Sequence, residues 1–533
     1  MESLLNPIDG FKECTSESKI SRFFGRNHLK GDKVFDLILF LFILYGLALK
    51  FRFALAIPLN SDSVLAGLVS REVLEHGNYF LSGYYFPSAD PYIFSDFLPF
   101  HLLPQLFSDY DPMALVVSSY LIFIGTVVVY SMLIYSITKN ITNSLIFSAL
   151  IANVPNSPFG WGSYSFFAVP TGHTATILFI GLLLLICEQD ARKEIKSILY
   201  LLILILISFS DSILILWYLV PFFVTQTFLN RPFELRKIIF PFISMASVGL
   251  IYLLKESVNT FVSIPVSLIT SKAQILDNWR LFYEGIALLY NFNLYQFTQT
   301  HRLDIQIAIL IPITIGIIYF IVVNISYNML KKPVCLFPLL SIAFTSIVYI
   351  FTSVSIDILT TRYLTFPLII CTVILALIYN KNTKHYRLYS VLFLLLVIIN
   401  AGSNLEAFKS GYQEPNQEQY ELISYLKESN LTYGYADYWD SNIITYLSKE
   451  EVIIRPVTFT DTGIVPFRWL SCERWFEEQG NITDKVFILQ RNMQKGEIEA
   501  IVNVNPPKET LEFGNYKIYV WNTQELQSLI HFS

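Results

Sequence analysis

The sequence is poor in charged residues. Of its 533 residues only 15% are Asp, Glu, Lys or Arg, whereas an ordinary soluble domain has about 25%. Hydrophobic residues make up 53% of the chain, which excludes a soluble globular enzyme, and aromatic residues make up 16%, which excludes a disordered chain. The formal net charge of -5 leaves no basic surface for a nucleic acid partner.

Paired cysteines and glycine-rich phosphate loops are also missing. The five cysteines stand singly along the chain, without the close spacing that zinc sites and disulfide frameworks need. We therefore expect them to be packing residues. No Walker-type phosphate loop is present, so nucleotide hydrolysis is not indicated.

What the sequence does contain is a series of long apolar runs. Many approach the length of about 17–25 residues that crosses a bilayer as a helix. We predict about eleven transmembrane helices. They lie near residues 34–57, 113–137, 142–155, 173–188, 196–209, 213–229, 237–254, 304–327, 334–355, 362–380 and 386–402.

The basic residues indicate how these helices are oriented. The N-terminal arm, residues 1–33, is basic, and so are alternate loops such as 192–196, 231–237 and 381–387. Cytoplasmic loops carry the excess of Lys and Arg. We therefore predict a multi-pass protein of the cell membrane with a cytoplasmic N-terminus. An odd number of spans places the C-terminus outside.

The remaining segments are more polar and fall on the predicted outer face. Two long outer loops, 58–112 and 255–303, interrupt the transmembrane domain over 34–402. The tail, 403–533, has shorter apolar runs and is large enough for one α/β domain. Its predicted strands are 452–458, 485–490 and 516–521, and its predicted helices are 416–429 and 468–478. The predicted fold is an α-helical polytopic membrane protein with a C-terminal extracytoplasmic α/β domain.

The first outer loop opens with a candidate catalytic acid. From Asp62 to Glu75 the apolar residues recur at helical spacing, which predicts an amphipathic helix on the membrane surface. Asp62 is its N-cap or a first-turn residue. The residues alone leave two compatible roles open for Asp62, a helix cap and a catalytic base.

Two further acids in this loop, Asp90 and Asp96, are reserve candidates for catalysis, with turn and cap chemistry as the alternative. Asp109-Tyr110-Asp111 has the Asp-x-Asp form of a nucleotide-sugar metal site. It directly precedes an apolar run, so helix capping is the favoured interpretation.

Candidate phosphate-binding residues lie at predicted outer helix ends. Arg362 opens the tenth apolar run, with interfacial anchoring as its alternative role, and Arg52 lies in the outer third of the first. His173 is a candidate for phosphate or metal binding, with a structural role as the alternative. His101 forms a weak candidate metal pair with Asp96.

The pattern in the first loop resembles that of a known family. It reads Asp62-Ser63-x-x-Ala66-x-x-x-x-Arg71-Glu72-x-Leu74-x-x-Gly77-Asn78. It is similar to the first outer loop of the C-class membrane glycosyltransferases (GT-C), especially the branch of dolichyl-phosphate-mannose protein mannosyltransferases and bacterial undecaprenyl-phosphate-sugar transferases. Arg362 followed by Tyr363 is similar to another element of this family, and the tail segments 433–439 and 486–489 resemble outer domains of its prokaryotic members.

The resemblance implies an inverting glycosyltransferase that uses a polyprenyl-phosphate sugar donor, with Asp62 as the base. Arg362, Tyr363, Arg52, His173 and His101 would bind the substrate. The acceptor would be a glycan, a lipid or a protein, in a prokaryotic cell membrane or in the endoplasmic reticulum. The family often has a second acid where this chain has Ser63, and a Lys-Pro-Pro element that this chain lacks. Whether a divalent cation takes part is therefore left open.

Two alternatives come from other functional classes. A transporter or lipid flippase would also have many spans, and a non-catalytic GT-C-like subunit would keep the fold without the chemistry. Convergence of Asp62 and Arg362 with at least one of Arg52, Lys50, His173 and Asp96 is the spatial test of the enzyme hypothesis.

Overall fold

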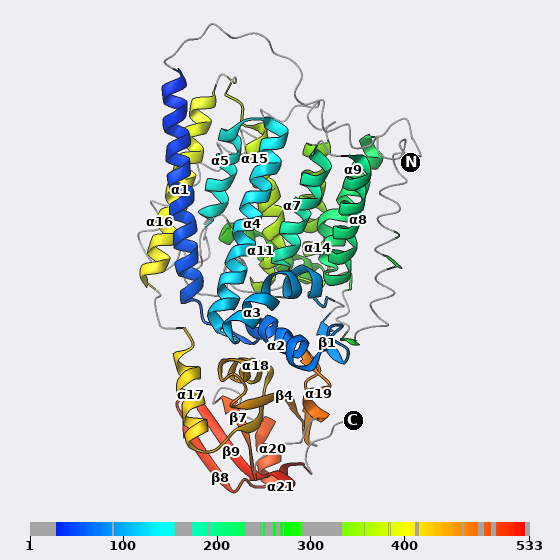
Figure 1. The fold of residues 1–533 in the computed structure, drawn as a ribbon, viewed down its shortest axis with the longest axis vertical. Coiled ribbons are helices and arrows are strands. Elements are labelled where there is room, and N and C mark those ends of the chain that lie inside the picture. The colour runs from blue at the N-terminus through cyan, green and yellow to red at the C-terminus, as the bar shows by residue number, and fades with distance from the viewer. Residues whose placement is uncertain are drawn as a thin grey trace.

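The computed structural model describes most of the chain. The described residues are 28–87, 90–154, 173–189, 192–229, 260–262, 267–269, 271–289, 333–356, 358–381, 385–410, 415–460, 463–477, 484–491 and 497–527, with a few single residues between them. These residues are mostly helical, and a sheet region follows near the C-terminus. In Figure 1 a bundle of roughly parallel helices occupies one part of the molecule, and the sheet region lies beyond one end of it.

The bundle contains helices that could cross a membrane. Three stretches, Lys33–Ala56, Pro112–Thr138 and Thr360–Ile378, are long and apolar enough by length and composition. The bundle helices are α1 (His28–Ala56), α4 (Pro112–Thr138), α5 (Ile141–Ala152), α7 (Thr174–Glu188), α8 (Lys193–Ser210), η4 (Ile215–Leu219), α9 (Val220–Leu229), α11 (Lys272–Leu289), α14 (Pro333–Phe351), η6 (Ile358–Leu364), α15 (Thr365–Ile378) and α16 (Tyr386–Ser410).

These bounds can be compared with the eleven apolar runs. The predicted segments coincide with helices except for 237–254 and 304–327, which lie almost entirely outside the described residues. Their number as transmembrane spans stays a prediction. The last of them differs at its end, because α16 continues to Ser410, beyond 402. No Gly or Pro lies between 403 and Ser410 to stop the helix at 402, and the more polar residues there mark only a change of environment.

Elements of the first loop lie across the end of the bundle, between it and the sheet region (Figure 1). They are α2 (Ser61–His76), β1 (Tyr84–Pro87), the π-helical segment η3 (Ile93–His101) and α3 (Leu102–Ser108). The predicted helix from Asp62 to Glu75 is confirmed. The Asn60 side chain caps it by accepting from the Ser63 backbone N–H at 2.9 Å, and Gly77 ends it in the left-handed region at φ 67.

The C-terminal region folds as a mixed sheet of six strands in the order β5-β4-β3-β7-β9-β8. Strands β4, β3 and β7 are parallel, and the outer strands are antiparallel to their neighbours. The strands are β3 (Tyr433–Ala436), β4 (Ile453–Thr460), β5 (Gly463–Pro466), β7 (Lys485–Arg491), β8 (Glu509–Phe513) and β9 (Tyr516–Asn522). The helices are α17 (Gln417–Glu428), α18 (Tyr438–Leu447), α19 (Arg474–Glu477), α20 (Glu497–Val504) and α21 (Thr523–Gln527).

The three predicted strands correspond to β4, β7 and β9, and the first predicted helix corresponds to α17, but residues 468–478 do not form one helix. Ser471–Cys472 is instead a short strand, β6, that lies outside the six-stranded sheet and pairs with β1. A second small strand, β2 (Thr260–Val262), pairs with β1 on its other side. Strands from three distant parts of the chain thus form one small sheet beside α2, a pairing that local patterns do not indicate.

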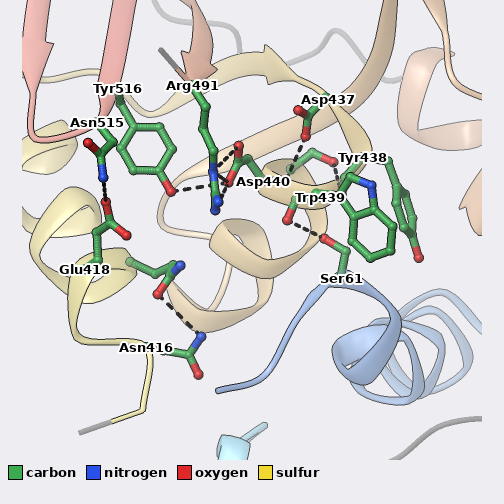
Figure 2. Close-up of polar contacts among 12 residues, drawn as sticks. Ser61, Asn416, Glu418, Asp437, Tyr438, Trp439, Asp440, Arg491, Asn515 and Tyr516 are labelled. Carbon is green, nitrogen blue, oxygen red and sulfur yellow. Dashed lines mark hydrogen bonds and ion pairs between the residues drawn. The ribbon is translucent and has the colours of Figure 1, made fainter. Parts of the chain in front are cut away.

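Helix α18 joins the sheet to the first loop. Figure 2 shows Asp440 of α18 held by Arg491 and Tyr516. The Arg491 guanidinium donates to the Asp440 carboxylate at 2.7–3.0 Å, and the Tyr516 hydroxyl donates at 3.3 Å. On its other side α18 packs closely on α2, because Gly67 leaves room for the Tyr446 ring. The Tyr446 hydroxyl then donates to Gln105 Oε1 at 2.9 Å.

The Gly67 contact predicts a large effect of one methyl group. A Cβ at Gly67 would lie 2.1 Å from Tyr446 Cε2, so we expect Gly67→Ala to destabilise the protein by about 1–3 kcal/mol. Gly402→Ala is the matched control, because a Cβ there meets nothing within 4 Å and should stabilise its helix by roughly 0.5–1 kcal/mol. Thermal unfolding of both variants measures the difference. Equal midpoints would show that α2 and α18 are not closely packed.

Candidate functional site

The Asp62 side chain lies in the first turn of α2, where a helix N-terminus favours a negative charge. The neighbouring Ser63 hydroxyl is turned back to the cap and donates to Asn60 Oδ1 at 2.7 Å. The Tyr438 hydroxyl, at the start of α18, donates to Asp62 Oδ1 at 2.5 Å. The first loop and the C-terminal region therefore meet at the candidate catalytic acid.

The environment of Asp62 makes its carboxylate a better base. Burial raises the pKa of Asp62 most strongly, while the hydrogen bond from Tyr438 and the positive charge of Arg362 lower it. The balance leaves the pKa above its ordinary value. A carboxylate with a raised pKa binds a proton more strongly, as a general base must. The charge of Arg362 therefore acts on Asp62, although the two residues are 300 positions apart in the sequence.

Arg362 lies in η6, the short helix before α15, and α11 packs against this segment. The close approach of α11 is made at Gly285, where a Cβ would lie 2.5 Å from Thr361 Cγ2. The Arg362 guanidinium donates through Nη2 to the Tyr363 hydroxyl at 3.4 Å and lies 5.3 Å from the centre of that ring. Its buried Nε has no hydrogen-bond partner among the described residues. A buried donor in this state is costly, so an anionic ligand at Arg362 would relieve the cost.

A second polar group lies next to Tyr363. His173 Nδ1 lies 2.9 Å from the Asp211 carboxylate, and the Thr176 hydroxyl donates to the same carboxylate at 2.5 Å. Asp211 Oδ1 also accepts from the Ile213 backbone N–H at 3.1 Å, as a cap of the helical turn that follows it does. The His173 ring lies 5.7 Å from the Tyr363 ring, centre to centre. Tyr363 thus contacts Arg362 on one side and His173 on the other.

Asp96 of η3 is buried near this second group. Burial raises the pKa of Asp96 to about 7, and the negative charge of Asp211 adds to this effect. The Ser95 hydroxyl, which donates to Asp96 at 2.6 Å, and the nearby His173 oppose it. Near neutral pH the Asp96 carboxyl can therefore hold or release a proton.

Asp90 forms hydrogen bonds to a turn distant from its own loop. Its two carboxylate oxygens accept from the Ser212 backbone N–H at 2.6 Å and from the Ser212 hydroxyl at 3.0 Å. These bonds tie the first loop to the turn between α8 and η4. Of the acids proposed from the sequence, Asp62 is therefore the one whose surroundings best suit a base.

Arg52 and His101 are not among the groups that act on Asp62 in the described part of the chain. Arg52 is exposed on α1, and the positive charge that acts on Asp62 is that of Arg362. His101 is buried, its Nδ1 has no hydrogen-bond partner within the described part of the chain, and burial lowers its pKa to about 4. His101 is therefore neutral. The groups that act on the Asp96 carboxyl include Ser95, Asp211 and His173. The Asp96–His101 metal pair stays a prediction.

The surroundings of Asp62 do not fit a divalent cation. Its partner Tyr438 donates a hydrogen bond, Arg362 adds a positive charge, and the Ser63 hydroxyl is held by Asn60. Cations such as Mg²⁺ need several oxygen ligands around them. In the described part of the chain, no group of three or more His, Cys, Asp and Glu side chains is placed to hold a metal ion.

Sequence reasoning missed the role of Tyr438. This residue lies in the tail segment 433–439, which was noted only for its resemblance to the outer domains of the family. Its contact with Asp62 joins residues 376 positions apart. Tyr92 was also missed, although its ring lies 5.5 Å from that of His173. No spacing rule connects such positions, because the contacts exist only in the folded chain.

Comparison with known proteins adds no family to this description. The sequence matches no family model, and the search of curated proteins gives no match either.

The His173–Asp211 group predicts a strong dependence of stability on Asp211. Asp211 is fully buried, and its loss leaves His173, Thr176 and the Ile213 N–H without their acceptor. We expect Asp211→Ala to lower the free energy of unfolding by roughly 3–5 kcal/mol. Glu499→Ala, which removes an exposed acid from α20, should leave the unfolding midpoint nearly unchanged. Similar midpoints for the two variants would contradict a buried structural role for Asp211.

Proposed function

We propose that this protein is a glycosyltransferase of the GT-C type. It moves a sugar from a polyprenyl-phosphate donor to an acceptor on the extracytoplasmic face of a membrane, by an inverting single displacement. The observation that carries this proposal is the convergence of Asp62, Arg362 and Tyr438 at one end of a bundle with membrane-like helices. The eleven spans and the cytoplasmic N-terminus predicted from the sequence belong to the same proposal.

The proposed reaction begins at Asp62. A hydroxyl group of the acceptor gives its proton to the Asp62 carboxylate while its oxygen bonds to the anomeric carbon of the donor sugar. The bond between that carbon and the phosphate oxygen breaks, and the phosphate leaves with the electron pair. Because the acceptor attacks the face opposite the leaving group, the anomeric configuration inverts. The raised pKa of Asp62 supports this role.

Arg362 is placed to stabilise the departing phosphate. It lies near the start of Thr360–Ile378, one of the three stretches apolar enough to cross a membrane. A polyprenyl phosphate holds its chain in the bilayer and its phosphate at the interface, the level at which an arginine at a helix end is expected. The buried Nε without a partner is a donor that a phosphate oxygen would satisfy.

The second polar group supports Arg362 from behind. His173, fixed by Asp211, packs its ring on Tyr363, and the Tyr363 hydroxyl accepts from the Arg362 guanidinium. This chain of contacts fixes the direction of the guanidinium before any ligand arrives. Preorganised charge stabilises a developing anion without reorganisation during the reaction.

The direct test is transfer by purified full-length protein from a panel of polyprenyl-phosphate sugars. We expect Asp62→Asn to lower the rate by at least about 100-fold, because the amide cannot take the proton. Asp109→Asn is the control, since Asp109 is an exposed acid outside the site. Full activity of Asp62→Asn would remove Asp62 from the mechanism. Absence of transfer from every donor would favour a transporter, a flippase or a non-catalytic subunit.

The Tyr438 hydrogen bond predicts a change in pH dependence. This bond lowers the pKa of Asp62, so Tyr438→Phe should raise that pKa further above its ordinary value. The base must be ionised to act. The acid limb of the pH profile of kcat/KM should therefore move to higher pH in Tyr438→Phe and stay in place in Tyr420→Phe, a remote exchange on α17. A limb that stays in place in both variants would contradict Asp62 as the titrating base.

A further inference from the structure

The C-terminal region contains a cavity of about 190 Å³ at the carboxyl ends of its parallel strands. Asp437 follows β3, Phe459 lies near the end of β4, and Gln490 lies near the end of β7. Tyr438, Trp439 and Phe467 complete the principal lining. This cavity is formed by the C-terminal region and is separate from the contacts of Arg362.

The strand order favours a ligand site at this position. The chain leaves β3 through α18 to reach β4 on one side, whereas β7 lies on the other side of β3. Where the direction of winding reverses in this way, the loops after neighbouring parallel strands separate and open a crevice. Asp437 and Gln490 come from β3 and β7, the two strands that flank the reversal.

The chemistry of the lining fits a sugar. Four aromatic side chains, those of Tyr438, Trp439, Phe459 and Phe467, offer ring faces, whose negative potential attracts the C–H groups on the apolar side of a pyranose. Asp437 and Gln490 add a carboxylate and an amide, which can bind neighbouring hydroxyl groups. None of the described lining residues is basic, so an anionic ligand is not favoured. The volume is below the roughly 300–1,000 Å³ of sites for drug-sized ligands and suits one small ring.

Trp439 is the residue that most directly indicates a ligand. Its side chain is 50% exposed although it lines the cavity, which is unusual for the largest aromatic residue of a small domain. Its backbone is fixed, since its carbonyl oxygen accepts from the Ser61 hydroxyl at 2.9 Å. The ring lies 5.2 Å from the Tyr438 ring in an edge-to-face arrangement. Figure 2 shows these two rings together next to the start of α2.

The cavity also lies next to the proposed catalytic base. Tyr438 lines the cavity with its ring and donates its hydroxyl hydrogen to Asp62 at 2.5 Å. A ligand bound against Tyr438 therefore contacts the same residue that donates a hydrogen bond to the Asp62 carboxylate. Ser61 and Asp62 are adjacent in α2, and they contact Trp439 and Tyr438, respectively. The position of the cavity relative to the Asp62 carboxylate is therefore fixed by these two contacts.

We propose that this cavity binds one pyranose unit of a carbohydrate, which serves as the acceptor of the transfer reaction. Binding of the carbohydrate stands on the cavity alone, and its role as acceptor rests on the proposed function. The neighbouring hydroxyl of the bound glycan is the group that reaches Asp62. Among glycan, lipid and protein acceptors, the lining thus selects a glycan.

The test is carbohydrate binding to the full-length protein in lipid nanodiscs, because sugar-based detergents would compete for the cavity. The probes are methyl α- and β-glycosides of glucose, galactose, mannose and N-acetylglucosamine, together with disaccharides of these sugars. Saturation-transfer NMR reports which ligand protons lie against the protein, and titration calorimetry gives the affinity. We expect at least one probe to bind with the C–H protons of one ring face most strongly saturated.

Matched variants locate the binding. Trp439→Ala should weaken it about tenfold, since a stacking surface is lost. Asp437→Asn should weaken it by a similar factor through loss of a charged acceptor, while Asn still caps α18. Tyr420→Ala, which removes an exposed aromatic side chain from α17 outside the cavity, should leave the affinity unchanged. Failure of all probes to bind, or equal affinity in Trp439→Ala, would overturn the proposal.

The two proposals fail in different ways. Binding by the Asp62→Asn protein without transfer would support both a carbohydrate site and the role of Asp62. Binding in the unchanged protein with no transfer from any donor would leave the cavity as a carbohydrate site and refute the transferase. Transfer to a lipid or protein acceptor without binding of any carbohydrate probe would refute the cavity proposal and leave the transferase intact.

Discussion

The close packing of α18 on α2 is the constraint on which the site depends. A glycine at position 67 lets the Tyr446 ring lie directly on the α2 backbone, and this approach sets the distance between the first loop and the C-terminal sheet. Ion pairs lie around the contact: Arg71 reaches Glu450 at 3.5 Å, and Arg474 reaches the buried Glu72 at 2.6 Å. Such ion pairs fix the relative orientation of the two regions more than they add stability, because desolvation offsets much of their electrostatic attraction. With the two helices fixed, the Tyr438 hydroxyl is placed on Asp62.

Charges are few in this chain, and several of them are gathered at one end of the bundle. Lys50 shows how a buried charge is handled elsewhere, since its ammonium group donates to the Val154 carbonyl oxygen at 2.9 Å. At the candidate site the arrangement is different: Arg362 keeps a buried Nε with no partner in the described part of the chain. A donor left in this state costs stability. A buried donor beside a carboxylate with a raised pKa is an arrangement often found at functional sites, and the proposed function uses it for a phosphate.

The sequence predicted well what is encoded locally. Helix α2 was predicted within one residue at each end because its cap, its apolar spacing and Gly77 all lie within 18 residues. Asp111 was predicted as the cap of α4, and its carboxylate accepts from the Met113 N–H at 2.7 Å. Contacts between distant parts of the chain were harder to predict. Arg52, ten positions from Asp62, is exposed on α1, whereas the positive charge that acts on Asp62 comes from residue 362. The partner Tyr438 could not be predicted, because it depends on how the sheet docks.

Tyr438 explains why a folded region should lie beyond the bundle at all. In the proposed reaction a base must be ionised before the acceptor arrives, and it must be near the acceptor hydroxyl when it does. One tyrosine serves both needs: its hydroxyl stabilises the Asp62 carboxylate, and its ring forms one wall of the cavity. A ligand that moves this ring also changes the hydrogen bond to Asp62 and, with it, the pKa of the base. In the proposed reaction, occupancy of the cavity would therefore be linked to the ionisation of the base through this single side chain.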